Sequence, residues 1–317
     1  MRGALAAAIF ATGAFAVSGA QAETRVTYKS AKSASSYYQM GVEIAEAMKA
    51  GTNGDIIVTL EESQGSVQNV MEAAVRQGNY VFTTPPVLVS LAQGGKAMFE
   101  GKGNPKFDEI RALFPIPSLT MHFVMRDDSG VTSLSGLEGK TILLGKGSFG
   151  ATEGEKYLKL FGLEGKVTIA DAELGNSAAA LKNGQIDGFV TAGSYPAPNV
   201  IEAAAGTGIT LIPLSDDEIA ETKRTKITIP AGTYAGVDTD TVTTSLPVVA
   251  YTTTAMDDDT AYQLTKTFWD QREAMGGSAA WWNAVSPDML ENLTGKLHPG
   301  ALRYYEEAGV TVPDVAK

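Results

Sequence analysis

The sequence predicts an α/β protein with two lobes, and three observations support this fold class. Segments typical of strands and of helices alternate along most of the 317 residues, which favours a mostly parallel sheet covered by helices. The alternation forms two successive units of similar build. The chain contains no Cys, so its stability must come from core packing, and it is long enough for two lobes of ordinary domain size.

The first 22 residues have the composition of a secretory signal. Arg2 supplies a positive charge, an apolar run follows over 4–17, and Ala-Gln-Ala at 20–22 matches a small-x-small cleavage site. A membrane anchor is the alternative, but the run is shorter than the roughly 20 residues that cross a bilayer. We therefore expect a cleaved signal peptide and a folded protein that begins near Glu23. The absence of Cys favours the bacterial periplasm over a eukaryotic secreted setting.

The first unit has the order β-α-β-α-β. Its helix over 36–50 carries apolar residues at helical spacing, including Met40, Ile44 and Met48. In a parallel sheet of this kind, the loops that follow the strands meet at one edge. The predicted elements are a strand over 25–28, a helix over 36–50, a strand over 55–60, a helix over 66–77 and a strand over 80–83.

The second unit again alternates strands and helices, and a helical C-terminal region follows it. Residues 227–236 are predicted to be an irregular loop. The predicted strands are 110–114, 121–125, 141–144, 167–169, 186–191 and an extended segment over 241–253. The predicted helices are 134–137, 153–161, 176–182, 198–205, 261–274, 279–283 and 300–308.

These units predict how the chain divides into lobes. Residues 23–121 together with 245–317 are expected to form lobe one, and residues 122–244 lobe two. The extended segments over 121–126 and 241–249 connect the two and are the expected hinges.

Small polar residues follow the first predicted strand, over 30–38. The Ser hydroxyls and the N–H groups of the helix that begins here are suited to an anion. A simple N-cap by Ser35 or Ser36 is the alternative, but one cap does not explain the excess of Ser and the Tyr pair. We therefore expect a binding loop, to which Thr83 at the end of a neighbouring strand is added.

Two further loops place Gly and Ser directly before a helix. Gly65 and Ser66 lie in the first, where an ordinary N-cap is an equally good interpretation. The second, over 145–152, lacks the order of a nucleotide-binding phosphate loop, but it remains suited to a carboxylate because a helix N-terminus favours negative charge. A fourth loop holds Tyr195, which either faces the cleft or packs on its own lobe.

These segments, in this order, resemble the TAXI family of TRAP-transporter solute receptors. The resemblance covers nearly the whole chain after the predicted signal. The matching segments are Tyr37-Tyr38, Gly65-Ser66-Val67 with Asn69, residues 126–140, residues 183–189 with 193–198, residues 229–236 and residues 297–309.

The resemblance implies a type II periplasmic binding protein, in which two α/β lobes close on a ligand at a hinge. It also implies delivery of the ligand to a membrane permease driven by an ion gradient. Ligands of the family include glutamate and related small carboxylates. The resemblance therefore implies a small organic anion as the ligand, with no cofactor.

Two departures from the family pattern concern the ligand. Where the family has Gly in the first loop, this chain has Ala31, Lys32, Ala34 and Ser35, which adds bulk near a ligand. Lys32 either adds a cation to the site or points to solvent, the usual position of a Lys. Phe149 stands in a run that is usually Gly-Ser-Gly-Thr and is expected to shrink the pocket or change its selectivity.

The expected site combines hydroxyls, backbone N–H groups and two aromatic rings that pack on the ligand body. It contains no catalytic residue and no metal ligand. The expected ligand-binding residues are Ser30, Lys32, Ser33, Ser36, Tyr37, Gly65, Ser66, Thr83, Gly147, Ser148, Phe149, Thr152 and Tyr195.

Composition argues against several other functions. The net charge of −11 disfavours nucleic acid as a partner. An exported hydrolase would need a base from the only two histidines, His122 and His298, and no G-x-S-x-G motif follows the signal. The binding protein of an ABC importer or a sensor remains an alternative. We expect a soluble periplasmic protein, monomeric and without enzymatic activity.

Overall fold

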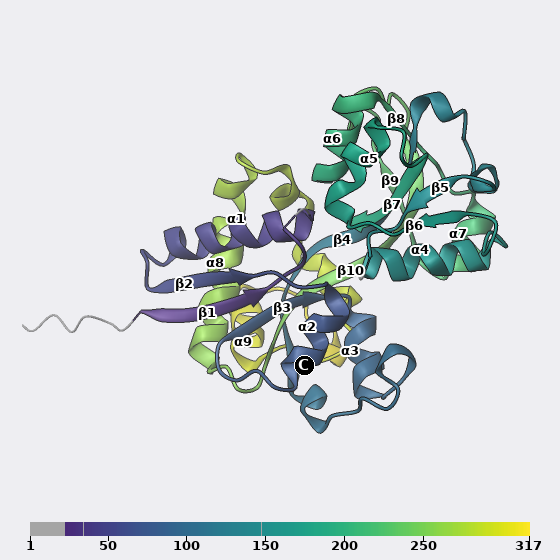
Figure 1. Cartoon of the computed structure of the whole chain (residues 1–317). Helices are drawn as coiled ribbons and strands as arrows, with labels where there is room; N and C mark the ends of the chain where they lie inside the picture. The colour runs from purple at the N-terminus through teal and green to yellow at the C-terminus, as the bar shows by residue number, and fades with distance from the viewer. Residues whose placement is uncertain (1–22, 34, 147) are drawn as a thin grey trace, which may run out of the picture.

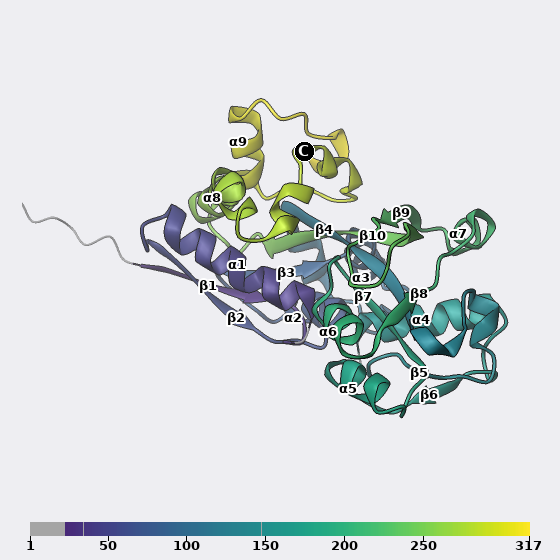
Figure 2. The same cartoon turned by 90° about the horizontal axis from the view of Figure 1, so that it is seen from above.

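The computed structural model describes residues 23–33, 35–146 and 148–317 (Figure 1). The predicted signal over 1–22 and the expected site residue Gly147 lie outside these ranges. Two α/β lobes lie on either side of two long strands, which run from one lobe into the other (Figure 2). Lobe one holds both ends of the described chain, and lobe two holds its middle. The predicted α/β class is confirmed.

The lobe-one sheet is parallel at its outer edge. Its elements are β1 (Thr24–Lys29), α1 (Ser36–Gly51), β2 (Ile56–Glu61), α2 (Ser66–Ala73), β3 (Tyr80–Thr84), α3 (Pro86–Gln93), α8 (Asp258–Gly276) and α9 (Pro299–Glu307). Short 3-10 helices cover Ala97–Phe99, Pro105–Glu109, Ala280–Ala284, Pro287–Asn292 and Asp314–Ala316. β1 pairs in parallel with both β2 and β3, while α8 packs against α1 and α9.

Lobe two repeats this construction around a shorter parallel sheet. Its elements are β5 (Thr141–Leu143), α4 (Phe149–Leu160), β6 (Thr168–Ala170), α5 (Ser177–Lys182), β7 (Gly188–Gly193), α6 (Pro198–Thr207), β8 (Ile209–Leu211), α7 (Asp216–Thr222) and β9 (Thr225–Ile229). Short 3-10 helices cover Asp127–Ser129, Leu134–Leu137 and Leu174–Asn176. β5 pairs in parallel with β6 and β7, and α5 packs against α6 (Figure 2).

The strands β4 (Ile110–Arg126) and β10 (Thr241–Thr253) join the lobes as an antiparallel pair. In lobe one β10 also pairs with β3, whereas in lobe two β4 pairs with β7 and β8. The β4–β10 register shifts between Leu246 and Val248. Pro247 lies at this shift and has no N–H group for the ladder. The expected hinge segments lie within these two strands.

Several predicted elements differ from the structure. The strands predicted at 110–114 and 121–125 are one strand, β4, which contains Pro115. At Pro115, β4 pairs with β10 on one side, while β7 and β8 pair with β4 only from Thr120 onward. Proline is tolerated there because the other side of β4 has no strand that needs its N–H group. The loop predicted at 227–236 begins inside β9, and the helix predicted at 66–77 ends at Ala73. The sequence analysis did not predict α3, α7 or β8.

Two buried clusters form the core. The larger one spans lobe one and continues along β4 and β10 into one face of lobe two. In it, Phe114 of β4 stacks on Phe268 of α8, with ring centroids 4.0 Å apart. The smaller cluster lies under α5 and α6 and includes Phe189 and Val200. Both lobes are therefore anchored to the crossing strands, and the loops between them are left to form a site.

Candidate functional site

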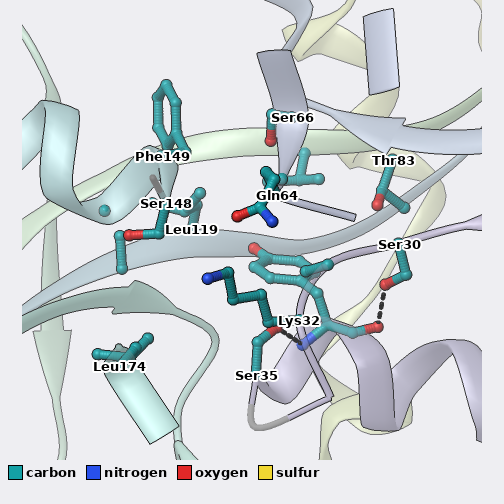
Figure 3. A pocket seen from close by; sticks show the side chains of 16 residues that line it. Ser30, Lys32, Ser35, Gln64, Ser66, Thr83, Leu119, Ser148, Phe149 and Leu174 are labelled. Atoms are coloured by element: carbon teal, nitrogen blue, oxygen red, sulfur yellow. Dashed lines mark hydrogen bonds between the residues drawn. The ribbon is translucent and has the colours of Figure 1, made fainter. Parts of the chain in front are cut away.

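A cavity lies between the lobes, where strands of both sheets end and helices begin. It encloses about 590 Å³ of space, including its open mouth. Both lobes and the crossing strands contribute side chains (Figure 3). The lining residues are Ser30, Ala31, Lys32, Ser35, Tyr37, Gln64, Gly65, Ser66, Thr83, Leu119, Ser148, Phe149, Gly150, Leu174, Ala192 and Val248.

One buried amide holds the lobe-one side of the cavity together. Asn69, in the second turn of α2, donates from Nδ2 to the carbonyl oxygens of Ser30 at 2.7 Å and Thr83 at 2.9 Å. These residues follow or end β1 and β3, so the amide joins two strand ends to one helix. Ser30 Oγ in turn donates to the carbonyl oxygen of Tyr37 at 2.6 Å. The predicted meeting of these loops at one sheet edge is present in the structure.

Two helix N-termini meet at the cavity. α2 follows Gly65, which adopts φ 110° and provides no side-chain cap. A Cβ atom at Gly65 would lie 3.6 Å from the backbone nitrogen of Phe149, the first residue of α4. The first N–H groups of a helix carry partial positive charge. The positive ends of α2 and α4 therefore converge on one space, which favours a negatively charged group there.

Four hydroxyl groups lining the cavity can still donate a hydrogen bond: those of Ser35, Ser66, Thr83 and Ser148. Thr83 is 4% exposed, and its Oγ1 makes no hydrogen bond to any residue that the structure describes. Ser35 Oγ accepts from the Tyr37 N–H at 3.1 Å, and Ser148 Oγ accepts from the Ala151 N–H at 3.0 Å. A hydroxyl that accepts one bond still has a proton to donate. These groups can therefore donate to a bound anion.

Lys32 lines the cavity but is already paired with a carboxylate. Its Nζ forms an ion pair with Glu173 of lobe two and donates to the carbonyl oxygen of Lys146 at 3.4 Å. The side chain is 23% exposed and that of Glu173 is 55% exposed. Of the two positions expected for Lys32, at the site or in solvent, the first describes its place on the cavity wall, where Glu173 neutralises its charge. The ion pair bridges the mouth between the lobes.

Tyr37 presents its ring to the cavity and its hydroxyl elsewhere. The hydroxyl donates to the carbonyl oxygen of Pro117 on β4 at 2.8 Å. Burial raises the pKa of Tyr37 well above its ordinary value, so the phenol stays neutral. The ring is thus available as an apolar surface, as expected for packing on a ligand body.

The chain belongs to a known family of proteins. Residues 30–309, most of its length, match the NMT1-like family. This protein is a member of the NMT1-like family. The narrower TAXI resemblance is not decided by that match.

Solved structures resemble this NMT1-like protein over most of its length. The periplasmic binding protein BugD is 12% identical, covers 92% of this chain and 99% of its own, and gives a TM-score of 0.53. A protein from Bordetella bronchiseptica RB50 is 15% identical, with 92% and 91% covered and a TM-score of 0.49. An ancestral arginine-binding protein bound to arginine is 11% identical, with 86% and 99% covered and a TM-score of 0.48. The BugD match shows that the NMT1-like chain has the fold of a periplasmic solute-binding protein.

Some residues expected at the site of the NMT1-like protein lie beside the cavity. Ser36 is buried, and its Oγ accepts from the Ser194 N–H of lobe two at 3.0 Å. The Ser33 N–H donates to Glu62 in a neighbouring hollow, and hydrogen bonding from the Ser33 side chain and then its backbone lowers the pKa of the Glu62 carboxyl. Thr152 lies on another hollow next to Phe149. Tyr195 packs against the smaller core cluster of lobe two, the alternative left open by the sequence.

The cavity also contains residues outside the list of expected ligand-binding residues. Five of them lie inside loops that were predicted to bind: Ala31, Ser35, Gln64, Gly150 and Ala192. The other three had no local signal, because Leu119 and Val248 come from the crossing strands and Leu174 from a 3-10 helix.

The two histidines lie away from the cavity of this NMT1-like protein. His122 is bonded through Nε2 to the Tyr234 hydroxyl at 2.9 Å and through Nδ1 to the Thr120 carbonyl at 3.1 Å. Burial lowers the pKa of His122 to about 4. His298 is bonded to the Met256 carbonyl at 3.1 Å. Both side chains are 1% exposed, so each is part of the core.

Within 23–33, 35–146 and 148–317, no three or more His, Cys, Asp or Glu side chains gather as metal ligands would. Over the same residues, no helix has the length and apolar character needed to cross a bilayer.

Proposed function

We propose that this protein is an exported solute receptor that captures a small organic anion between its lobes and delivers it to a membrane transporter. One observation carries this proposal: the N-termini of α2 and α4 meet at a cavity lined by hydroxyl donors. Backbone N–H groups at a helix start bind carboxylates without a counter-cation. The proposed role is binding and release, with no bond made or broken.

The arrangement of the lobes supports closure on a ligand. The walls of the cavity belong to different lobes, and the lobes are joined by β4 and β10. Movement about the proposed hinges, 121–126 and 241–249, would open the cavity. The proposed lobes are residues 23–121 with 245–317 and residues 122–244. A receptor must release its solute at the membrane, so a hinge with two accessible states suits the role.

The transporter is proposed to be a TRAP-type permease in the inner membrane. The ordered TAXI motifs support this choice, and the signal pattern over 1–22 supports a periplasmic location. Inspection of the adjacent reading frames tests it. A multi-span TRAP permease is expected there, and an ABC ATPase without such a permease would contradict this part of the proposal.

Thermal unfolding of the chain from Glu23 to Lys317 tests the anion proposal. A ligand that binds only the native state raises the melting temperature. We expect at least one small carboxylate among mono-, di- and 2-oxo acids to raise it, while the corresponding neutral amide does not. Flat responses to every carboxylate, or equal responses to an acid and its amide, would overturn the proposal.

A further inference from the structure

We infer that the cavity selects a short monocarboxylate with a hydrocarbon body over dicarboxylates and amino acids. This inference rests on the proposed function, because it names the class of anion held at the same site. Three features carry it: a strongly apolar part of the wall, a free buried hydroxyl beside one anion position, and the neutralisation of the charged group at the mouth.

The first feature is the distribution of apolar and polar side chains. Figure 3 shows Ser30, Ser66 and Thr83 on one side of the cavity, with Phe149 and Leu174 on the other. From the crossing strands come Leu119, 4% exposed, and Val248, 3% exposed. The Tyr37 ring adds another carbon surface because its hydroxyl is bonded to Pro117. A hydrocarbon body buried against these groups is stabilised, whereas a second polar end placed against them would lose its water to carbon surface.

The second feature is the free hydroxyl of Thr83. Thr83 as a residue is more than nine-tenths buried, and Asn69 Nδ2 joins its carbonyl oxygen to α2. Its Oγ1 makes no hydrogen bond within the described part of the chain. A carboxylate at the two helix ends would accept the Oγ1 proton as well as backbone N–H groups. The hydroxyl thus marks one carboxylate position in the cavity, on the lobe-one side.

The third feature is charge. Among the described lining residues Lys32 is the only charged one, and Glu173 neutralises it. A second carboxylate would find no free cation there. An α-ammonium group would find no carboxylate either, since Glu173 is paired and no Asp or Glu lines the cavity in the described part of the chain. Burial of an unpaired charge is unfavourable, so both kinds of ligand are expected to bind more weakly because of the charge they add.

Calorimetric titration with three matched acids tests the inference. 4-Methylpentanoate has one carboxylate and a branched hydrocarbon body, leucine adds an α-ammonium group to it, and glutarate replaces the body with a second carboxylate. We expect 4-methylpentanoate to bind at least about tenfold more tightly than the other two. Equal or tighter binding of glutarate or leucine would overturn the inference and leave the anion receptor standing. Failure of every acid would overturn both.

Paired Thr variants test the position of the carboxylate. Thr83→Val removes the free hydroxyl and keeps the shape, and it is expected to weaken 4-methylpentanoate binding about tenfold or more, as for a bond to a charged group. Thr84→Val is the matched control: Thr84 is also buried with an unpartnered Oγ1, but it does not line the cavity. Equal affinities of the two variants would contradict the assignment.

A third variant tests the charge argument. Glu173→Gln removes the carboxylate that neutralises Lys32 and leaves the cation free at the mouth. Glutarate is expected to gain about fivefold in affinity, while 4-methylpentanoate changes little. An unchanged ratio of the two affinities would show that the ion pair does not exclude the second carboxylate, and the charge argument would fail.

Discussion

The two walls of the cavity are built in the same way, and the N-cap residues of their helices differ. On each wall a helix begins close to where a strand ends, with its N–H groups toward the cavity. In lobe one the N-cap of α2 is Gly65, which has no side chain to satisfy those groups. In lobe two the N-cap of α4 is Ser148, whose Oγ accepts from the Ala151 N–H. Free donors are therefore concentrated on the lobe-one wall.

The remaining residues extend this difference. Lobe one adds Ser30, Ser66 and Thr83, whereas lobe two adds Phe149 and Leu174. We infer that lobe one binds the carboxylate of the ligand and that lobe two covers the hydrocarbon body of the ligand. In general, two helix N-termini with similar backbones differ in the number of free N–H donors that a ligand can use, because a side-chain cap occupies some of these donors.

The largest expected effect is on the free energy of unfolding, and it comes from a buried histidine behind the lobe-two wall. His122 on β4 is paired with Thr191 on β7, next to the lining residue Ala192. Its folded pKa of about 4 lies below the ordinary 6.5. The unfolded chain binds the proton first, so stability is complete above pH 6.5 and is lost as the pH falls toward 4. The loss from this residue is about 3 kcal/mol.

Chemical denaturation of the wild type and of His122→Gln between pH 7.5 and 4 measures this effect. The variant should be less stable at pH 7.5 and should lose about 3 kcal/mol less on acidification. Carboxyl groups elsewhere titrate in both proteins, so their contribution cancels in the difference. Identical slopes for the two proteins would show that His122 is not held neutral in the fold.

A smaller effect on stability is expected from Gly65, the N-cap residue of α2 on the lobe-one wall. Gly65→Ala places a side chain at φ 110°, and such strain costs of order 1–3 kcal/mol. Its Cβ would also approach the Phe149 nitrogen. We expect lower stability and anion binding at least about tenfold weaker.

Gly54→Ala is the control for the Gly65 variant. Gly54 has φ +90°, and a Cβ there meets nothing within 4 Å. The Gly54→Ala variant should lower stability by a similar amount, while its affinity for the anion, measured by calorimetry, should not change. If both variants bind with wild-type affinity, the uncapped start of α2 is not the anion position and the contrast between the walls fails.

The polar wall could be predicted from the sequence because its signals are local. Gly-Ser pairs and Ser-rich loops follow strand patterns, and a parallel sheet brings such loops to one edge. That reasoning placed Ser30, Gly65, Ser66 and Ser148 on one cavity, as the structure does. It also predicted the α/β class, since alternation along the chain is sufficient for it.

The apolar wall and the mouth could not be predicted, because they depend on contacts between distant segments. Leu119 and Val248 meet only through the pairing of β4 with β10 across a register shift. Glu173 is 141 residues from Lys32, and the pair forms only when the lobes meet. Ser36 has the local pattern of a site residue, yet its hydroxyl is used by Ser194 of the other lobe. Local composition cannot distinguish a group that binds ligand from one that joins lobes.

The smallest expected effect concerns the lobe-two wall itself. Phe149 is 7% exposed and lines the cavity at the start of α4. Phe149→Leu keeps an apolar side chain and enlarges the space, so stability should fall by less than about 1.5 kcal/mol. Affinity for 4-methylpentanoate should fall about threefold, whereas a bulkier acid such as 3-phenylpropanoate should gain relative to it.

Phe161→Leu is the matched control, since Phe161 follows the same helix, packs partly buried on the larger core cluster and does not line the cavity. It should leave the ratio of the two affinities unchanged. If Phe149→Leu also leaves the ratio unchanged, the hydrocarbon body does not rest on lobe two. The selection for an apolar body would then come from the crossing strands, through Leu119 and Val248, and the two parts of the ligand would be bound by lobe one and the hinge rather than by the two lobes.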